Sequence, residues 1–512
     1  MAQNRSFIYN LIAQLVVFAS NMIVNFFLTP YVVGKLGTEA YGFIGLINTV
    51  VGYASIATVA LNALAGRYIT LAYHRGDMKQ ANEYYSSVFY ANTLMSLVIL
   101  VLTAALTVNV TQVLQIPFGL EEDVQIAVCL SAVNTIISLL SVVYGVAAFI
   151  KNKLYLNSLA QMAGSLIRVC VIASLYALAK PHLWFYALAA SLAAWIMMIL
   201  QKRITKKLCS EFQLQRQFFR LDRICEIVRE GIWISLENLN VILQTGLDLL
   251  ITNWFVNPVA TGILSIAKTL PNAFKQMTSA VSSVYYPDLA RLYATGQKKE
   301  LVDSFRFSLR FMSMIMMVPL VGFIVFGTDF FSLWLPEEKM ETILLIQHVS
   351  VLTVVPLLAN SVVEVLYYAN TLTKKIKGSV LITFALSLAG FFVTIILLYI
   401  TEVQPLYIIA GTSSMFIVVR CALITPIYAA YVLQVPKTTF FLPLLRPAVI
   451  AVFLSGMFMV VEGIVLVDTW VEMLIQCGLC GIVGYFIVYL MLFNTDERKK
   501  VVALVRRIIR KK

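Results

Sequence analysis

Six polar residues recur every three or four positions within an otherwise apolar stretch, residues 258–287. They are Ser265, Lys268, Asn272, Lys275, Ser279 and Ser282. This spacing places all six on one face of a helix. Two ammonium groups in the middle of an apolar span would each cost about 2.5–3.5 kcal/mol. Such a face needs water, a carboxylate or an anionic ligand beside it, so Lys268 and Lys275 are candidate anion-binding residues.

Other charged residues are also embedded in apolar stretches. Arg168 and Arg420 are basic residues far from the ends of their stretches, and we expect them to be further anion contacts. Embedded acids are fewer, namely Glu237, Asp248 and Glu364. These acids are candidate counter-ions or carriers of a coupling proton or Na⁺. The excess of embedded bases predicts a cationic interior that suits an anionic ligand.

Polar stripes mark two further apolar stretches and indicate a duplication. The first stripe holds Asn10, Gln14, Asn21 and Asn25, and the second holds Glu237, Asn240, Gln244 and Asp248. A shift of 223 residues pairs Gln14 with Glu237, Asn21 with Gln244 and Asn25 with Asp248. Just after each stripe, Ala40-Tyr41-Gly42 matches Ala260-Thr261-Gly262 at a shift of 220. The two matches together are typical of an internal repeat.

Two interpretations of these stripes stay open. A polar face can hydrogen-bond to a neighbouring helix, or it can line a water-filled cavity. The formal charges favour the cavity for the second stripe. We expect the cavity to be lined by the neutral residues Gln14, Asn21, Asn25, Asn240, Gln244 and Asn272. The first and second stripes should then face each other across it.

The composition is typical of a multi-pass membrane protein. Of 512 residues, 60% are hydrophobic and 13% charged, with a mean hydropathy of +0.85, whereas soluble domains are about 45–50% apolar. A span needs about 20 apolar residues. The sequence predicts about fourteen spans, at residues 7–33, 39–71, 82–109, 123–149, 154–179, 182–204, 226–254, 258–287, 304–330, 341–369, 378–400, 404–432, 440–463 and 470–493.

Basic residues crowd into alternate gaps between these spans. Because basic loops stay in the cytoplasm during insertion, both termini are predicted to be cytoplasmic. The net charge of +13 lies mainly in these gaps and in the C-terminal tail, so nucleic acid is not an expected partner. The tail alternates apolar and basic residues, which predicts an amphipathic helix lying on the anionic cytoplasmic leaflet.

The gaps also predict the domain organisation. Residues 1–204 form an N-terminal six-helix bundle, 205–225 a basic cytoplasmic loop and 226–432 a second six-helix bundle. Residues 433–493 add two spans, and 494–512 form the basic tail. An even number of helices in each half returns the chain to the cytoplasm, so the halves should be parallel repeats.

Several other functions are disfavoured. The cysteines form no framework, and Cys477 and Cys480, although spaced as a CxxC, lie within a predicted span as small packing residues. The three histidines are scattered, so neither a metal site nor another bound cofactor is expected. No GxxxxGK[ST] motif is present, which argues against ATP hydrolysis in this chain. The short outer loops hold no nucleophile–His–acid set, so we expect the protein not to be an enzyme.

Short motifs resemble a known family. The turn Leu36-Gly37-Thr38-Glu39-Ala40-Tyr41-Gly42 resembles the LG-x-x-x-YG turn of polysaccharide-export proteins. The segment Asn62-Ala63-Leu64-Ala65-Gly66-Arg67-Tyr68, followed by Arg75-Gly76-Asp77, is similar to the end of their second helix. These proteins belong to the multidrug/oligosaccharidyl-lipid/polysaccharide (MOP) exporter superfamily.

The resemblance implies an all-α membrane fold of about 14 helices, in which two six-helix bundles form a V around a central cavity, as in MATE transporters, with two extra helices. It also implies a Wzx-type flippase for undecaprenyl-pyrophosphate-linked oligosaccharide units in the bacterial inner membrane. Such units supply O-antigen, capsule or exopolysaccharide, and a polysaccharide polymerase is a candidate partner.

The cationic interior and the implied substrate agree. Lysine and arginine can neutralise a diphosphate, and the two bundles would rock about the site. Three alternatives remain: a multidrug exporter of the same fold, a flippase for the lipid II-type peptidoglycan precursor, and a membrane-embedded polymerase or ligase. A drug exporter would favour embedded acids, whereas a lipid II-type substrate shares the polyprenyl pyrophosphate.

Overall fold

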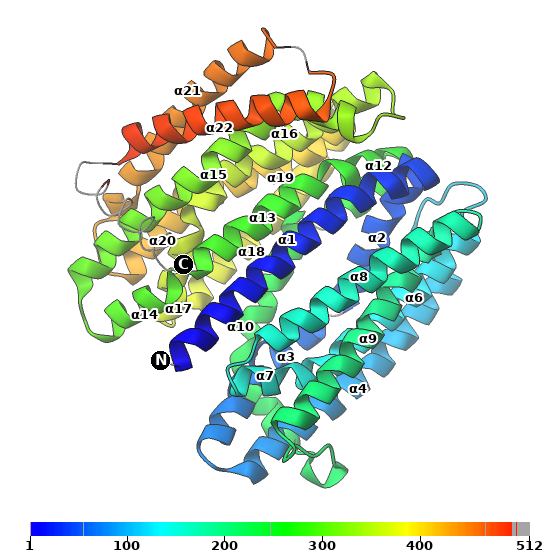
Figure 1. Cartoon of the computed structure of the whole chain (residues 1–512), viewed down its shortest axis with the longest axis vertical. Helices are drawn as coiled ribbons and strands as arrows, with labels where there is room; N and C mark the ends of the chain where they lie inside the picture. Colours follow the sequence, from blue (N-terminus) through cyan, green and yellow to red (C-terminus); the bar gives the residue numbers. More distant parts are fainter. Residues whose placement is uncertain (1, 55, 246, 466, 494–497, 499–512) are drawn as a thin grey trace. The chain divides into compact units, whose positions relative to one another are not determined.

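The structure is a computed structural model that describes the chain apart from residues 1, 55, 246, 466, 494–497 and 499–512. Every regular element in the described residues is a helix (Figure 1). The chain divides into two compact units, unit 1 (Met1–Ser265) and unit 2 (Ile266–Lys512). The predicted all-α class is therefore confirmed.

Unit 1 begins with helices that correspond to the first six predicted spans. They are α1 (Ala2–Leu36), α2 (Thr38–Ala54), α3 (Ile56–His74), α4 (Met78–Val108), α5 (Val110–Val113), α6 (Glu121–Ser141), the 3₁₀ turn η1 (Val142–Gly145), α7 (Val146–Ile150), α8 (Tyr155–Leu178) and α9 (Trp184–Leu208). The short η2 (Arg216–Phe218) follows, then α10 (Leu221–Thr245) and α11 (Leu247–Phe255). Helix α12 (Pro258–Ala267) crosses the boundary between the units.

Unit 2 contains the remaining helices. They are α13 (Thr269–Ser283), α14 (Tyr286–Ala294), α15 (Lys298–Trp334), α16 (Met340–Val363), η3 (Glu364–Leu366), α17 (Tyr367–Leu372), α18 (Ile376–Ile400), α19 (Pro405–Val419), the π-helical turn η4 (Arg420–Ile424), α20 (Thr425–Val432), η5 (Lys437–Phe440), α21 (Leu442–Glu462) and α22 (Trp470–Leu492). Helices α21 and α22 pack on α15, where Phe458 stacks on Phe326 with ring centroids 5.6 Å apart. The two extra helices are thus part of the unit 2 core.

The described helices agree roughly with fourteen spans. Eleven are long and apolar enough to cross a membrane, and α2 and α3 together would make a twelfth, bent by 71°. The other two predicted spans, 226–254 and 258–287, are divided into α10 and α11, and into α12 and α13. These two are the spans that carry the embedded charges Glu237, Asp248, Lys268 and Lys275, so their apolar content is the lowest.

Irregular turns recur at equivalent positions of the two repeats. Gly76 and Gly296, 220 residues apart, have φ of 78° and 69°, and the backbone hydrogen bonds around them follow the same pattern. Asn152 and Lys374, 222 residues apart, have φ of 52° and 55° although neither is glycine. The same shift of 222 relates the starts of η1 and η3. The recurrence of these turns supports the duplication.

The seventh predicted span begins with α10, which packs on α3 and α4 of unit 1. Ile227 of α10 is fully buried in the same core as Ile69 of α3. A Cβ added to Gly231 would clash with the Ala60 carbonyl oxygen, so the two helices touch through their backbones. The predicted domain boundaries stay a prediction, and the predicted tail lies outside the described residues apart from Arg498.

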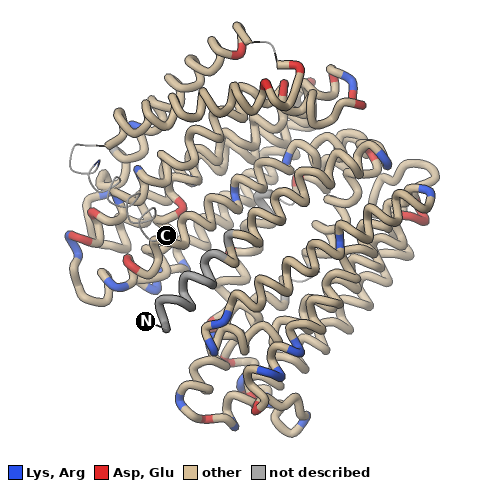
Figure 2. The backbone as a smooth tube through the Cα atoms, in the orientation of Figure 1, with Lys and Arg blue, Asp and Glu red and all other residues tan. Residues whose placement is uncertain are grey.

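Lys and Arg gather mostly at one end of each unit (Figure 2). In unit 1 this end includes the α3–α4, α7–α8 and α9–α10 connections, and in unit 2 it includes the α14–α15 and α17–α18 connections. This distribution fits the positive-inside rule. The cytoplasmic location of the termini stays a prediction.

Candidate functional site

Three of the charged residues predicted for the site lie at irregularities in the helices of unit 2. Lys268 lies at the break between α12 and α13, and Glu364 begins the 3₁₀ turn η3. Arg420 begins the π-helical turn η4. Such turns disturb the regular helical hydrogen bonding and occur often at functional sites. Each charged side chain therefore leaves its helix at a point where the backbone departs from the α-helix.

Asn360 connects Arg420 to Glu364. Its Oδ1 accepts hydrogen bonds from Arg420 Nη2 (3.2 Å) and Cys421 Sγ (3.4 Å). Its Nδ2 donates to Glu364 Oε2 at 3.2 Å. The Asn360 amide thus accepts from the Arg420 cation through its oxygen and donates to the Glu364 carboxylate through its nitrogen. These two bonds fix the orientation of the amide.

Lys275, on the adjacent α13, completes the group. Arg420, Glu364 and Lys268 are all close enough to act electrostatically on its ammonium group. Lys275 is partly buried, and it makes no hydrogen bond or ion pair with any described residue. We call Lys268, Lys275, Arg420 and Glu364 the unit 2 charge cluster. With three positive groups and one negative group ionised, this cluster carries two net positive charges.

One aromatic residue, Tyr367, flanks the charge cluster. The Arg420 guanidinium lies 5.8 Å from the centre of the Tyr367 ring, a distance typical of a cation–π contact. The Thr425 hydroxyl is 3.5 Å from the Tyr367 hydroxyl. These contacts limit the orientations of Arg420 without neutralising its charge.

The polar stripe of α1 contacts α8 within unit 1. Asn21 Oδ1 accepts a hydrogen bond from the Ser165 hydroxyl at 2.7 Å. Asn25 Oδ1 accepts one from Arg168 Nη2 at 3.1 Å. Both asparagines therefore bond between helices, which was one of the two interpretations of the stripe. Arg168 thus belongs to this group of contacts in unit 1, and its part in a shared anion site stays a prediction.

Arg168 lines a cavity of about 150 Å³ in unit 1. Side chains from α2, α6, α8 and α9 surround it: Ile44, Ile47, Asn48, Ala127, Ser131, Asn134, Arg168, Leu183, Tyr186, Ala187 and Ala190. The Tyr186 hydroxyl accepts a 2.7 Å hydrogen bond from Arg168 Nη2, and the Arg168 guanidinium lies 4.9 Å from the centre of the Tyr186 ring. The cavity thus combines one cation with polar and apolar surfaces.

The remaining predicted residues lie in varied environments. On α10 and α11, Asn240 is fully buried, Asp248 is buried and Glu237 is partly buried. Gln14 and Asn272 are exposed on α1 and α13, and the side chain of Gln244 lies outside the described residues. Their lining of a shared lumen stays a prediction. Within the described part of the chain, no group of three or more His, Cys, Asp or Glu residues could hold a metal ion.

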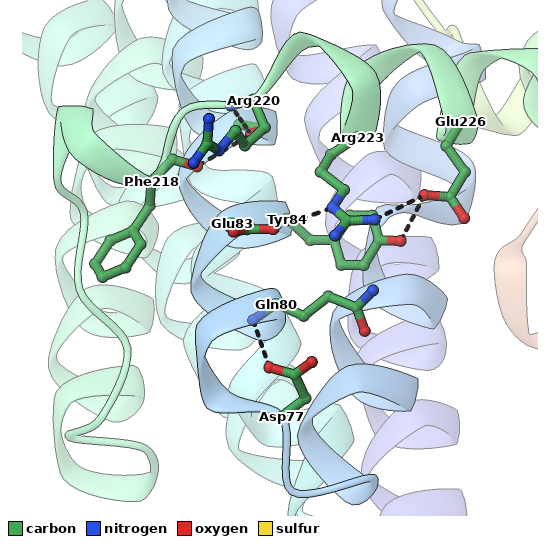
Figure 3. A network of polar contacts seen from close by, with 9 residues as sticks. Asp77, Gln80, Glu83, Tyr84, Phe218, Arg220, Arg223 and Glu226 are labelled. Carbon is green, nitrogen blue, oxygen red and sulfur yellow. Dashed lines mark hydrogen bonds and ion pairs between the residues drawn. The ribbon is translucent and has the colours of Figure 1, made fainter.

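Polar contacts also fix α10 to α4 (Figure 3). Arg223 Nε donates to Glu83 Oε2 at 3.1 Å, and Arg223 Nη1 lies 3.5 Å from Glu226 Oε2. The Tyr84 hydroxyl donates to the same Glu226 oxygen at 2.7 Å. This Arg223 network holds the beginning of the seventh span against the fourth helix of unit 1.

The loop before α10 is also attached to α4. Asn82 Nδ2 donates to the Glu211 carbonyl (3.2 Å), and the Gln213 N–H donates to Asn82 Oδ1 (2.9 Å). The Ser86 hydroxyl donates to the Gln213 carbonyl at 2.9 Å. The region predicted as a basic loop therefore follows the surface of α4.

Several of these residues were missed from the sequence. Asn360 lies four residues before Glu364, so its place on the same helical face could have indicated it. Tyr186 and Tyr367 gave no such signal, because tyrosines are frequent in this chain.

Comparisons with known proteins agree with this architecture. Residues 36–343 match the model of the family described as "Polysaccharide biosynthesis protein". The uncharacterised membrane protein EpsK of Bacillus subtilis (strain 168) is 27% identical over 501 residues, which cover 97% of each chain.

Two solved structures show the same fold. The lipid II flippase MurJ, in an inward closed conformation, has a TM-score of 0.66 at 13% identity, covering 94% of this chain and 98% of that one. The eukaryotic MATE transporter AtDTX14 has a TM-score of 0.62 at 14% identity, covering 87% and 99%. The chain therefore belongs to the polysaccharide biosynthesis protein family, and it has the fold of the MurJ and MATE structures.

Proposed function

We propose that this protein moves polyprenyl-pyrophosphate-linked oligosaccharide units across the bacterial inner membrane for the assembly of a surface polysaccharide. The observation that carries the proposal is the position of Lys275 in the unit 2 charge cluster. Two cations, Lys268 and Arg420, and one acid, Glu364, act electrostatically on its ammonium group. A diphosphate that links a lipid to a sugar carries two negative charges. These would balance the two net positive charges of the cluster.

The transport step follows from solvation. Phosphates and sugar hydroxyls lose their water on entering hydrocarbon, at a large cost in free energy. Cationic side chains replace that hydration with charge-assisted hydrogen bonds, while the polyprenyl chain stays in the bilayer. The two repeats would then expose the site alternately to each side. Coupling to a proton or Na⁺ gradient through Glu237, Asp248 or Glu364 is part of the proposal, as is delivery to a polysaccharide polymerase.

The test is the loss of surface polysaccharide in cells that carry Lys275→Gln or Lys268→Ala at normal membrane abundance. Lys275→Arg should be tolerated better than Lys275→Gln, because it keeps the positive charge. Lys180→Gln is the matched control, because Lys180 is exposed and lies outside the cluster. Full polysaccharide export by both cluster variants would refute the proposal.

A lipid II-type flippase is the second candidate, since the fold matches that of MurJ. Its substrate would present the same diphosphate to the charge cluster and would differ in the glycan. Growth of a cell depleted of its own lipid II flippase, rescued by this protein, would favour that candidate. Loss of surface polysaccharide with intact peptidoglycan synthesis would favour the first.

A further inference from the structure

We infer that the unit 1 cavity around Arg168 binds a sugar that carries a single carboxylate, so that the transported glycan contains an acidic residue. The inference rests on the proposed function, because it concerns the glycan part of the same substrate. It depends, however, on residues of unit 1, whereas the diphosphate proposal depends on the unit 2 charge cluster.

The hydrogen bonds of Arg168 leave part of its guanidinium available. Nη2 donates to both Asn25 and Tyr186, and the Tyr186 ring packs near the guanidinium. The Nε atom is shielded from solvent and has no hydrogen-bond partner among the described residues. A buried donor without a partner costs about 1–3 kcal/mol. A ligand oxygen in the cavity cannot reach the shielded Nε, but Nη1 is accessible and also makes no hydrogen bond with a described residue, so a carboxylate can accept from Nη1.

The positive charge of Arg168 also lacks an anionic partner. Within the described residues no carboxylate lies within ion-pair distance of its guanidinium. Asn25 and Tyr186 are neutral acceptors, so they orient the guanidinium without cancelling its charge. An anion in the cavity would therefore gain a charge-assisted hydrogen bond in a partly desolvated place.

The other polar groups of the cavity fit sugar hydroxyls. Asn48 lies on α2, and Ser131 and Asn134 lie one turn apart on α6. Two amides and a hydroxyl can both donate and accept hydrogen bonds, as ring hydroxyls require. Tyr186 adds an aromatic surface beside the cation, against which the apolar face of a sugar ring can pack.

The charge of the cavity selects the class of anion. Among the described residues that line the cavity, Arg168 is the only Lys or Arg. A diphosphate brings two charges and suits the unit 2 charge cluster, whereas one carboxylate matches one guanidinium. A volume of about 150 Å³ leaves room for little more than one sugar ring. The single positive charge and the small volume of the cavity together indicate a monoanionic sugar.

The experiment compares D-glucuronate with D-glucose, which share a ring and differ in the carboxylate. Binding to the full-length protein in lipid nanodiscs is measured by ligand-observed NMR. Glucuronate should bind at least about tenfold more tightly than glucose, going by one charge-assisted hydrogen bond. Arg168→Gln should remove this preference, and Lys275→Gln should retain it. Equal binding of both sugars, or a preference that survives Arg168→Gln, overturns the inference.

A second variant covers the case in which Arg168→Gln does not fold. Asn134→Leu would fill the cavity without altering the partners of Arg168, and it should weaken glucuronate binding by a similar factor; unchanged binding counts against the inference.

Farnesyl pyrophosphate, tested on the same samples, separates the two proposals. Its binding should be lost in Lys275→Gln and kept in Arg168→Gln. If farnesyl pyrophosphate fails to bind the unaltered protein while glucuronate binds, the diphosphate proposal fails alone.

Discussion

The Cα atom of Gly262 lies 2.5 Å from the position that a Cβ atom on Gly42 would occupy, so the two backbones are in direct contact. These glycines are equivalent residues of the two repeats, 220 positions apart. One turn later, a Cβ on Gly45 would lie 2.5 Å from the Ser265 hydroxyl oxygen, and these two residues are again equivalent. Within unit 1, helices α2 and α12 therefore pack closely through Gly42 and Gly45.

Gly42→Ala should destabilise the protein, because the added Cβ meets backbone atoms that a side-chain rotation cannot move. Overpacking of this kind costs about 1–3 kcal/mol. Gly52→Ala is the matched control in the same helix, since a Cβ there would meet no atom within 4 Å. Thermal unfolding of the two purified variants should show a lower midpoint for Gly42→Ala only. Equal midpoints would contradict the close contact.

The sequence was sufficient to predict that Gly42 and Gly262 are equivalent, but not that they touch. The equivalence depends on a repeated pattern of residue types, whereas the contact depends on how distant helices pack. The same distinction holds for the site. Lys275 and Arg420 were found because charge is costly in an apolar span. The connection of Arg420 to Glu364 through Asn360 depends on where two separate helices depart from the α-helix, which no local pattern encodes.

The Arg223 network should stabilise the attachment of α10 to α4. Glu83→Gln removes the carboxylate that accepts from Arg223, while both side chains are largely buried, at 10% and 27% exposed. We expect a loss of about 1–3 kcal/mol, typical of a partly buried group left without its partner. A double-mutant cycle with Arg223→Gln isolates the pair. Additive effects on the free energy of unfolding would show that the pair contributes nothing.

Two cysteines test the orientation of the α9–α10 connection. Cys225 is exposed, whereas Cys209 is 1% exposed and burial raises the pKa of its thiol. A raised pKa lowers the fraction of reactive thiolate at a given pH. In single-cysteine variants, an impermeant maleimide should label Cys225 in inside-out vesicles and not in intact cells. Cys209 should react slowly in both until the protein unfolds. Labelling of Cys225 in intact cells would reverse the predicted orientation.

Asn360→Asp should weaken the binding of a diphosphate to the unit 2 charge cluster. The substitution keeps the shape of the side chain and its acceptor for Arg420, but it adds a second carboxylate beside Glu364. The net charge of the cluster then falls from two positive charges to one. Because close, desolvated charge pairs contribute several kcal/mol, the affinity should fall at least about tenfold.

The measurement is the dissociation constant of farnesyl pyrophosphate, with Asn109→Asp as the control for an added carboxylate away from the cluster. Asn109 is exposed, and among the described residues its side chain bonds only the Ala105 carbonyl of the preceding helix. The control should bind as the unaltered protein does. A loss that is equal in both variants would assign the effect to overall charge. An unchanged affinity in Asn360→Asp would show that the charge of the cluster does not hold the diphosphate.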